Sequence, residues 1–571
     1  MGSYPSKSLK DVSGKSYQYV VIGGGAAGCV VAARLSEDPN ITVLVLERGP
    51  VVDSWLSKIP LFSSNITDKN APVYRIPSAP AKALGDQTMT LVGGKALGGS
   101  TKVNALLYTR STPGEYNAWE RAGRKGWGWD AVEPFFKKSE HYSAAAGLSF
   151  RGSKGPWQTR GSPEITFEST TRALDAVPSL GIQTVKMDND PSSPAVVCTL
   201  LDTTIDPHGR RSDTMQAFLP SKVVRTRKNL HVCTGAVVTS LDISDGKVTG
   251  VFFCSESGTE QFRVSVEKEA VLCAGAIASP HILLLSGVGP RDDLAPLNIP
   301  LVKHLPGVGA HLQDHVSVPI IYQVPITDSI DLLIERPLAA IPQLFKYVFT
   351  GRGILGNQVQ QANIMFRTSL ADVQNASPQD LDAQNPDNVP DAEIMLLPVN
   401  PSGARPSGFP KSAGTFSIMT TAVRPKSTGS VKLALADPRA QPICDLGMLM
   451  DASDRVPLRK ALKSALELGR AVQKSGYSIS EYDAPASESD ADLDAFITAK
   501  SITTYHYSSS CRMAEENEGG VVDDELRVHG LAGLRIADAS VFPWVPACHL
   551  QAPVVMIAER CAEFVKNSRA L

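Results

Sequence analysis

The sequence predicts an α/β fold built around a Rossmann-like dinucleotide-binding domain that is discontinuous along the chain. Three observations lead to this prediction. A glycine-rich β-α-β pattern lies near the N-terminus, dense motifs return after residue 500, and Pro-rich loops with apolar strands fill the region from roughly 320 to 495. At 571 residues the chain is also too long for one ordinary hydrophobic core. We therefore expect two domains, the second of which interrupts the first.

The first element is the β-α-β unit over residues 18–47. Its first apolar run breaks into the pattern Gly23-x-Gly25-x-x-Gly28 before a helical pattern begins. Gly23 allows a tight turn, Gly25 lets the backbone approach a pyrophosphate, and Gly28 lets the helix pack on the strand. The N–H groups at the helix start would bind the phosphates, because they have no partners within the helix and carry the positive end of its dipole.

The second apolar run of this unit ends in Glu47, 19 residues beyond Gly28. An acidic residue at a spacing of about 20 reaches the ribose of a bound dinucleotide. We therefore expect Glu47 to contact the adenosine ribose, with Ala26, Ala27 and Arg48 beside the cofactor. A glycine-rich turn without any ligand is the alternative interpretation.

Further elements are predicted from periodicity and turn signals. Residues 229–241 and 250–273 alternate as strands do, with the turn sequence Ser244-Asp245-Gly246 between them. Residues 278–285 and 456–473 carry helical patterns. Residues 371–390 are rich in Asp, Asn and Gln, and we expect this segment to lie at the surface.

The composition argues against several classes of partner. With 56 Lys and Arg against 58 Asp and Glu, the net charge of −2 gives no bulk attraction to nucleic acid or to an anionic membrane. No segment approaches the ~18 uninterrupted apolar residues of a membrane span. The N-terminal residues lack the apolar core of a secretory signal, so we expect a cytoplasmic protein.

The cysteines and two closely spaced histidines raise the question of a metal site. None of the nine cysteines forms a CxxC pair, which argues against zinc or a disulfide framework and favours buried, reduced thiols. His311 and His315 have the i, i+4 spacing of metal ligands on a helix, but they follow a Pro-Gly-x-Gly loop. We therefore expect no metal.

Four further segments carry glycine-rich or histidine-containing motifs. Residues 93–104 read GGKALGGSTKVN, and residues 275–290 read GAIASPHILLLSGVGP. Residues 305–315 contain LPGVG followed by LQDH, and residues 533–553 contain GLRIADAS followed by HLQAP. Together with the β-α-β unit, these segments closely resemble the glucose-methanol-choline (GMC) family of flavin oxidoreductases. The resemblance extends over residues 17–566.

This resemblance implies FAD and a two-domain fold. The FAD-binding domain would comprise residues 1–160, 205–318 and 500–571. The substrate-binding domain, of α+β type with an antiparallel sheet, would comprise residues 161–204 and 319–499. Both parts together give the expected fold class, α/β with a discontinuous Rossmann-like domain.

Carried over position by position, the resemblance also implies further contacts with the FAD. Val238 would pair with adenine through its backbone, and Asp538 and Ala539 would approach the diphosphate and ribitol from a helix N-terminus. An ordinary helix N-cap is the alternative for Asp538. Val103 stands where some members carry a His that binds the flavin covalently, so we expect non-covalent FAD. The remaining expected FAD contacts are Gly98, Gly99, Ser100, Asn104 and Gln551.

Two histidines are the catalytic pair that the resemblance implies. Oxidation of an alcohol removes a hydride and a proton, and the carbon releases hydride readily only when its oxygen carries developing negative charge. An imidazole, with an unperturbed pKa of about 6.5, suits removal of the hydroxyl proton near neutral pH. We expect His506 to be this base and His549 to hold the substrate oxygen.

The segment that carries His506 departs from the family pattern. Relatives have His-Pro-x-Gly-Thr-Cys-x-Met, whereas this chain has Tyr507 in place of the proline and Ser509 in place of the glycine. Two alternatives therefore stand beside alcohol oxidation. One is a lyase or cyclase reaction with FAD retained structurally, as in some family members, and the other is a flavin-binding protein without activity.

The expected substrate is a small-molecule alcohol, or a hydrated aldehyde, of aromatic or secondary-metabolite type. Oxygen or another acceptor would take up the electrons. Tyr505 and Trp544 flank the two histidines and are expected to line the substrate pocket, with a place in the hydrophobic core as the alternative. The sequence gives no indication of the oligomeric state.

Overall fold

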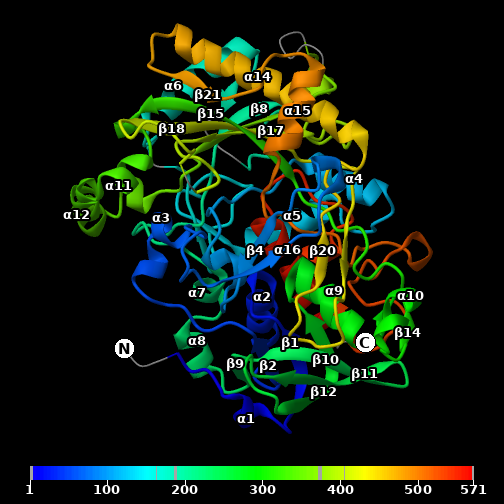
Figure 1. The fold of residues 1–571 in the computed structure, drawn as a ribbon. Helices are drawn as coiled ribbons and strands as arrows, with labels where there is room; N and C mark the ends of the chain where they lie inside the picture. The colour runs from blue at the N-terminus through cyan, green and yellow to red at the C-terminus, as the bar shows by residue number, and fades with distance from the viewer. Residues whose placement is uncertain (1–3, 163, 186–188, 371–375, 404, 569–571) are drawn as a thin grey trace.

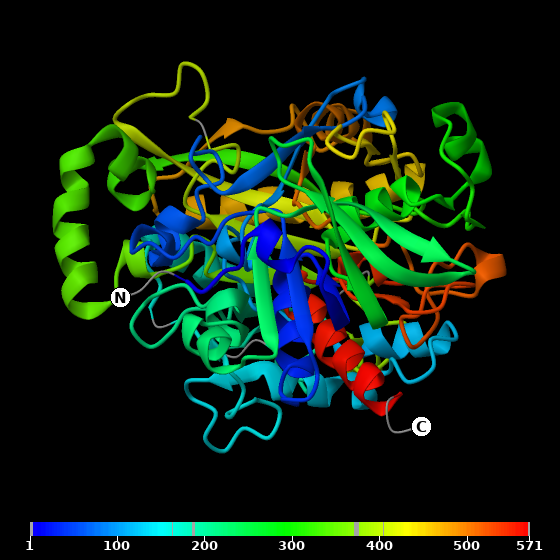
Figure 2. The same cartoon turned by 90° about the horizontal axis from the view of Figure 1, so that it is seen from below.

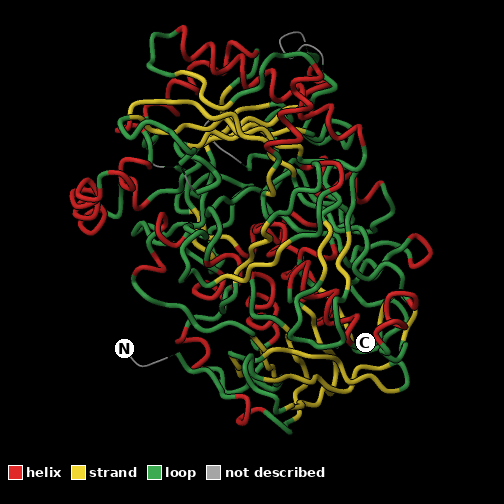
Figure 3. The backbone as a smooth tube through the Cα atoms, viewed as in Figure 1, coloured by secondary structure: helices red, strands yellow, loops and turns green. Residues whose placement is uncertain are grey.

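Two β-sheets stacked at a distance from each other organise the molecule (Figure 1). The computed structural model describes residues 4–162, 164–185, 189–370, 376–403 and 405–568. Much of the chain between the two sheets is loop, as the backbone tube in Figure 3 shows. No helix among these residues is long and apolar enough to cross a membrane.

The first sheet has the strand order β10-β11-β12-β1-β2-β9, with β23 beside β12. The core of this sheet is parallel, because β1 pairs in parallel with β2 and β12, and β9 and β23 extend that arrangement. The β10-β11 hairpin adds antiparallel strands at one edge. Its strands are β1 (Ser16–Ile22), β2 (Val43–Glu47), β9 (Leu230–Thr234), β10 (Val237–Ser244), β11 (Lys247–Cys254), β12 (Gln261–Leu272) and β23 (Leu534–Ile536).

The second sheet has the order β21-β15-β18-β17-β16-β8-β7, with β22 beside β15. All its pairings are antiparallel except that of β7 with β8. The expected antiparallel sheet of the second domain is therefore confirmed. Its strands are β7 (Thr184–Val185), β8 (Val197–Leu200), β15 (Val316–Pro325), β16 (Ala362–Phe366), β17 (Ala392–Leu397), β18 (Ala413–Ala422), β21 (Ser480–Asp483) and β22 (Ile502–Thr503).

Helices pack against both sheets. α14 packs on β15, β17 and β18, and lies above the second sheet in Figure 1. α16 lies against α2, and Figure 2 shows this C-terminal helix beside the N-terminal elements. The helices of at least nine residues are α2 (Ala26–Leu35), α4 (Pro113–Arg121), α5 (Trp129–Ser139), α6 (Glu168–Ala176), α9 (Gly275–Leu285), α12 (Ala340–Thr350), α14 (Arg455–Lys474), α15 (Asp490–Lys500) and α16 (Gln551–Asn567).

Two predicted strands are each divided in the structure. The strand expected over residues 229–241 is β9 followed by β10, because Gly235 at φ +74° breaks the extended backbone. The strand expected over residues 250–273 is β11 followed by β12, with a short loop between them. Both predicted helices are present. The first begins three residues earlier than expected, at Gly275.

The expected surface segment and the expected domain borders also differ in detail from the structure. Residues 371–375 lie outside the described residues. Most of residues 376–387 are exposed or partly exposed, as expected, whereas Ala383 and residues 388–390 are buried. β15 extends across the expected border between residues 318 and 319. β22 pairs with β15 in the second sheet, yet it lies at residues 502–503, within the expected FAD-binding domain. The exact boundaries of the two domains stay a prediction.

The β1–α2 turn depends on backbone that only glycine allows. Gly23 adopts φ +97°, and a Cβ there would lie 2.6 Å from the carbonyl oxygen of Cys273. A Cβ on Gly28 would lie 1.8 Å from the carbonyl oxygen of Gly23. The missing side chains therefore let α2 rest directly on the end of β1.

We expect Gly28→Ala to destabilise the protein by about 3 kcal/mol or more, because the added methyl must push α2 away from a rigid backbone carbonyl. Ala33→Gly, which removes a methyl from the same helix, is the matched control and should cost about 1 kcal/mol. Denaturant unfolding of both variants measures this difference. Equal destabilisation by the two substitutions would contradict the close-packing interpretation.

Candidate active site

The start of α2 forms a cradle for an anion at the carboxyl end of β1. Gly25 is the N-cap and supplies no side-chain hydrogen bond, so the first N–H groups of the helix have no cap. Gly99 closes the cradle from a second segment, because a Cβ there would lie 2.7 Å from the Cα of Gly25. This bare backbone fits the pyrophosphate of the expected FAD.

Glu47 lies next to this cradle and is buried. Its two carboxylate oxygens accept hydrogen bonds from the backbone N–H of Gly24, at 2.7 Å, and of Gly49, at 2.6 Å. Burial raises the pKa of Glu47 to about 7. Arg48 instead points toward solvent and pairs with Glu256 at 3.1 Å. Contact of either residue with the adenosine ribose stays a prediction.

The structure brings Asn104 and Gln551 together from opposite ends of the chain. Asn104 Nδ2 donates to Gln551 Oε1 at 2.9 Å. Asn104 Oδ1 accepts a hydrogen bond from Arg211 Nη1 at 2.8 Å. Ser100 Oγ accepts from the N–H of Gly94 at 3.0 Å and so fixes the adjacent turn. The residues expected at the flavin end therefore share one hydrogen-bonded network.

Arg211 is a member of this network that the sequence interpretation missed. It is buried, and burial lowers its pKa to about 9. Its guanidinium donates to hydroxyl, carbonyl and amide oxygens rather than to a carboxylate. A buried cation thus lies one hydrogen bond from Asn104.

Asp538 has the geometry of an N-cap. Its Oδ1 accepts the N–H of Ser540 at 2.8 Å at the start of the short helix that includes Ala539. Its Oδ2 accepts from Gly275 N at 2.8 Å and from the Ser279 hydroxyl at 2.5 Å. The alternative weighed for Asp538, a structural cap, is therefore present. Its approach to the diphosphate stays a prediction, as does the contact of Val238, which lies in β10.

The two expected catalytic histidines lie face to edge, with a third imidazole behind them. The ring centroids of His506 and His549 are 5.0 Å apart. His315 Nδ1 lies 2.9 Å from His506 Nδ1, a hydrogen bond in which one ring donates and the other accepts. His315, considered above only as a metal ligand, is therefore a partner of His506. Among the described residues no group of three or more His, Cys, Asp or Glu could hold a metal ion.

Asp314 holds the loop that carries His506. Its Oδ1 accepts the backbone N–H of His506 at 2.8 Å, and its Oδ2 accepts the hydroxyl of Thr503. The pairing of β15 with β22 sets this geometry, because Val316 lies opposite Thr503. Burial raises the pKa of Asp314 to about 7, against the lowering effect of these hydrogen bonds.

Burial and mutual proximity keep two of the imidazoles neutral. The pKa of His506 is lowered well below 6.5, by burial first and then by His315 and His549. Burial lowers the pKa of His315 to about 3. When His506 donates through Nδ1 to His315, its Nε2 carries a lone pair and no proton.

Glu393 is the second functional candidate that the sequence interpretation missed. It is buried in β17, and its Oε1 lies 3.2 Å from His549 Nε2. Asn363 Nδ2 donates to the same oxygen at 2.9 Å. Burial raises the pKa of Glu393, but His549 and Asn363 outweigh this effect and the net pKa is lowered. The sequence did contain a signal for Glu393: it is the one charged residue in a run of otherwise apolar residues, the strand β17.

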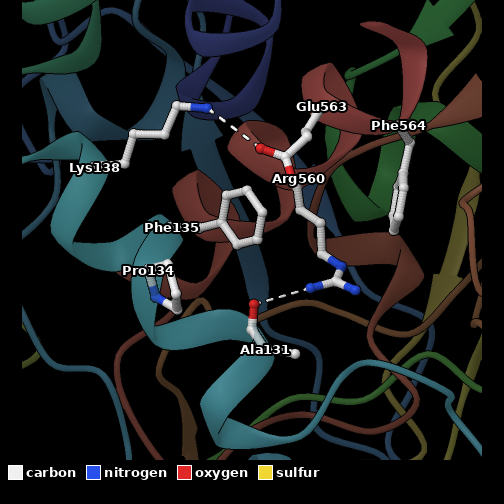
Figure 4. A pocket seen from close by; sticks show the side chains of 7 residues that line it. All are labelled: Ala131, Pro134, Phe135, Lys138, Arg560, Glu563 and Phe564. Carbon is white, nitrogen blue, oxygen red and sulfur yellow. Dashed lines mark hydrogen bonds and ion pairs between the residues drawn. The ribbon is translucent and has the colours of Figure 1, made fainter. Parts of the chain in front are cut away.

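A cavity of about 70 Å³ opens beside His549. Its lining combines apolar side chains with the polar groups around His549, and examples are Trp129, Pro194, Val197, Met365, Thr109, Asn363 and Glu393. A larger cavity of about 300 Å³ lies between α5 and α16 (Figure 4), where Arg560 Nη1 donates to the carbonyl of Ala131. No expected catalytic or cofactor residue lines this larger cavity, whereas His549, but not His506, lines the smaller one.

Tyr505 and Trp544, the two expected pocket walls, do not line the cavity beside His549. Tyr505 is 43% exposed, and Trp544 donates from Nε1 to Glu115 at 2.6 Å. Their assignment to the substrate pocket stays a prediction.

The residue changes around His506 leave the backbone shape of the loop glycine-like. Ser509 has φ +66°, the left-handed conformation that favours glycine. Tyr507 is buried, and its hydroxyl accepts the N–H of Val92 at 3.2 Å. Tyrosine in place of proline therefore adds a hydrogen bond between the His506 loop and the strand segment that contains Val92.

The arrangement as a whole suits proton transfer from a hydroxyl group. When His506 is the donor to His315, it is a neutral imidazole with a free lone pair, and it lies beside an imidazole that is hydrogen-bonded to a buried carboxylate, His549. The first can accept a proton, and the second can donate a hydrogen bond to an oxygen that gains negative charge.

Comparisons with known proteins agree with this geometry. The family model described as GMC oxidoreductase matches residues 17–317 with its N-terminal part and residues 425–558 with its C-terminal part. The mitochondrial choline dehydrogenase of Mus musculus is 31% identical, covering 99% of this chain and 92% of its own. Dehydrogenase str4 of Strobilurus tenacellus is 31% identical, with coverage of 98% and 96%.

Solved structures agree as well. Pyridoxine 4-oxidase from Mesorbium loti superposes with a TM-score of 0.83 at 25% identity, covering 97% of this chain and 99% of that one. Formate oxidase of Aspergillus oryzae RIB40, studied for its FAD modification, superposes with a TM-score of 0.85 at 25% identity, with coverage of 98% and 99%. The chain therefore belongs to the GMC oxidoreductase family and is an FAD-dependent oxidoreductase.

Proposed function

We propose that this enzyme oxidises a small alcohol, or a hydrated aldehyde, with His506 as the general base. Bound FAD would supply, at flavin N5, the acceptor for the hydride that leaves the substrate carbon. The observation that carries the proposal is the hydrogen bond between His506 Nδ1 and His315 Nδ1, at 2.9 Å. In the proposed tautomer His506 donates through Nδ1 in this bond, and its Nε2 is then free to accept the hydroxyl proton.

His315 and Asp314 act as positioning residues in this proposal. Asp314 fixes the backbone of His506, and His315 fixes the orientation and tautomer of its ring. As His506 takes up a proton, its Nδ1–H continues to donate to neutral His315. The hydrogen bond therefore persists through proton transfer and needs no rearrangement.

His549 and Glu393 stabilise the negative charge that develops on the substrate oxygen. The buried carboxylate accepts from Nε2 of His549, which directs the Nδ1 edge of the ring away from Glu393. Where Nδ1 of His549 carries a proton as well, it donates a hydrogen bond to the substrate oxygen as negative charge develops there.

The cavity supports an aromatic or secondary-metabolite alcohol as the substrate. Trp129, Pro194, Val197 and Met365 contribute apolar walls, and Glu393 contacts His549 at the polar part of the lining. Oxygen or another acceptor completes the cycle. The relative from Mus musculus is named as mitochondrial, whereas we keep the cytoplasm as the proposed location of this protein.

For the cofactor we propose non-covalent binding at the glycine cradle, since Val103 offers no nucleophile. Gly25→Ala provides the test. Its Cβ would meet no protein atom closer than 3.9 Å, so it should fold normally, but the methyl would occupy space that the pyrophosphate needs. We expect acid precipitation to release FAD from the yellow wild type, and Gly25→Ala to be purified largely colourless. Full FAD content in this variant, or FAD that stays attached after precipitation, would contradict the assignment.

His506→Ala should lower the rate of alcohol oxidation by roughly 10²–10⁴-fold, the range typical of a general base. His549→Asn is the matched comparison and should cost less, because Asn still donates a hydrogen bond to the substrate oxygen. Stopped-flow measurement of flavin bleaching under anaerobic conditions reports both rates. High pH should partly rescue His506→Ala, since more alkoxide forms unaided. A more damaging His549→Asn would reverse the two roles.

The pH profile follows from the lowered pKa of His506. A base acts only when unprotonated, and His506 loses its proton well below pH 6.5. We therefore expect kcat/KM to stay on its plateau as pH falls to 6.5 and to decline only at lower pH. A half-maximal rate at pH 6.5 or above would show that another group, or an unshifted His506, is the base.

Glu393→Gln should lower the oxidation rate by about 10²-fold, the loss typical for one oxyanion-stabilising group, while keeping the side-chain shape. If Glu393 acts through His549, the same substitution should have little further effect in the His549→Asn background. Rates of the two single variants and the double variant test this. Additive losses would mean that Glu393 contributes by another route.

The same anaerobic experiment separates oxidation from a lyase or cyclase reaction. Oxidation bleaches the flavin, whereas a non-redox reaction consumes substrate and leaves the spectrum unchanged. The glycine-like backbone of Ser509 favours oxidation, because the loop keeps the shape that presents His506. Product formation without bleaching would favour the non-redox alternative, and neither product nor bleaching over a wide alcohol panel would favour an inactive flavoprotein.

A further inference from the structure

An apolar ridge stands out from the body of the molecule along α11 (Asp331–Glu335) and α12. Figure 1 shows these helices projecting at the left edge, and Figure 2 shows α12 along the same edge from below. We define the apolar ridge by its exposed side chains, which are Trp55, Ile334, Leu338, Ile341, Leu344, Phe345, Val348 and Phe349.

The ridge differs from scattered surface apolar residues because its exposed side chains are grouped on neighbouring turns of one helix and its flank. Leu338 and Phe349 are each 79% exposed, and Phe345 is 60% exposed. Ile341 is followed by apolar residues at i+3, i+4 and i+7, so one side of the helix presents a continuous apolar surface. An exposed patch of this kind marks an interaction site.

The opposite side of α12 anchors the ridge to the protein. Of the residues of α12, all of which the structure describes, Tyr347 is the buried one. It packs with Ile59 and Leu355, and its ring lies 6.3 Å from that of Trp55. The helix is therefore held by its inner side, and its apolar outer side has no partner among the described residues.

The charges along α12 and its two flanks are basic, whereas α11 is acidic: Glu335, next to Ile334, pairs with Arg405 at 3.0 Å, and Asp331 is buried. Residues 336–352 contain Arg336, Lys346 and Arg352 and no Asp or Glu. Lys346 Nζ lies 3.7 Å from Glu164 Oε1, and both side chains are about half exposed, which makes this pair weak. An apolar surface flanked by cations and by a tryptophan is complementary to the interface of an anionic lipid bilayer.

A second copy of this chain fits the ridge less well. An 11-residue helix is about 16 Å long and 10 Å wide, a footprint of about 160 Å². A stable dimer buries about 800 Å² on each partner. A two-fold interface through the ridge would also bring the like-charged flanks of both copies together.

We propose that the apolar ridge docks this enzyme peripherally on an anionic membrane surface. α12 lies in the plane of the interface, with Phe345, Val348 and Phe349 among the acyl chains. Arg336 and Arg352 contact lipid phosphates and anionic headgroups. The docking needs no membrane span, and the overall charge of −2 does not oppose it, because the cations are local.

Vesicle co-sedimentation of the purified holoenzyme tests the proposal. The probes are phosphatidylcholine vesicles with and without about 30 mol% phosphatidylserine. We expect wild type to bind the anionic vesicles, and the double variant F345Q/F349Q to bind at least about ten-fold more weakly. The double variant L435Q/M450Q changes two residues that are 59% and 60% exposed outside the ridge, and it should bind like wild type.

A second variant separates the charge effect from the apolar effect. R336Q/R352Q should lose about ten-fold in binding to the anionic vesicles, and added salt should remove this difference. Its weak binding to pure phosphatidylcholine should equal that of wild type. Unchanged FAD spectra and oxidation rates in all variants establish that the fold is intact.

Three results would overturn the proposal. The first is a wild type that does not sediment with anionic vesicles. The second is equal vesicle binding by F345Q/F349Q and wild type. The third is a wild-type dimer that F345Q/F349Q dissociates while vesicle binding is absent, which would assign the ridge to self-association.

Discussion

The close approach of backbone segments at the carboxyl end of β1 is the constraint on which the rest of the structure depends. Gly28 rests on the carbonyl of Gly23, and Gly99 rests on the Cα of Gly25. Gly23 in turn lies against the carbonyl of Cys273 at the end of β12. Three segments distant in sequence therefore meet where α2 begins, and none of these contacts leaves room for a side chain.

The same convergence explains why the FAD-binding fold is discontinuous. Asp538, from the C-terminal part, accepts hydrogen bonds from Gly275 and Ser279 at the start of α9. Gln551, at the start of α16, bonds to Asn104. The chain returns to the first sheet after residue 500, where β23 pairs with β12, and from there it supplies these hydrogen-bonding groups.

The candidate catalytic cluster depends on the second sheet rather than the first. Asp314 and His315 immediately precede β15, and the pairing of β15 with β22 brings them to the loop of His506. β17 supplies Glu393 to His549 across the same region. The imidazoles thus lie where the two sheets face each other, and burial there keeps His506 neutral.

The sequence by itself determined the features that depend on neighbouring residues. The β-α-β unit, the glycine turn and the α14 helix follow from local periodicity and from backbone conformations that only glycine allows. The five motifs likewise identified the family, the cofactor and the two histidines, because each motif is a short contiguous segment. The alternation of apolar and polar residues did not show where β9 ends at Gly235 or where β11 ends, because the same alternation can continue past the end of a strand.

Only the tertiary structure decided which distant groups meet. Nothing near His315 in the sequence distinguishes a partner of His506 from a structural residue, and Glu393 and Arg211 lie in segments with no catalytic motif. Strand register brings these residues next to their partners. Burial then makes each hydrogen bond or ion pair important, because an unpaired buried charge is energetically costly. The exposure of the apolar ridge was equally hidden, because a helical pattern of apolar residues normally indicates the side that faces the core.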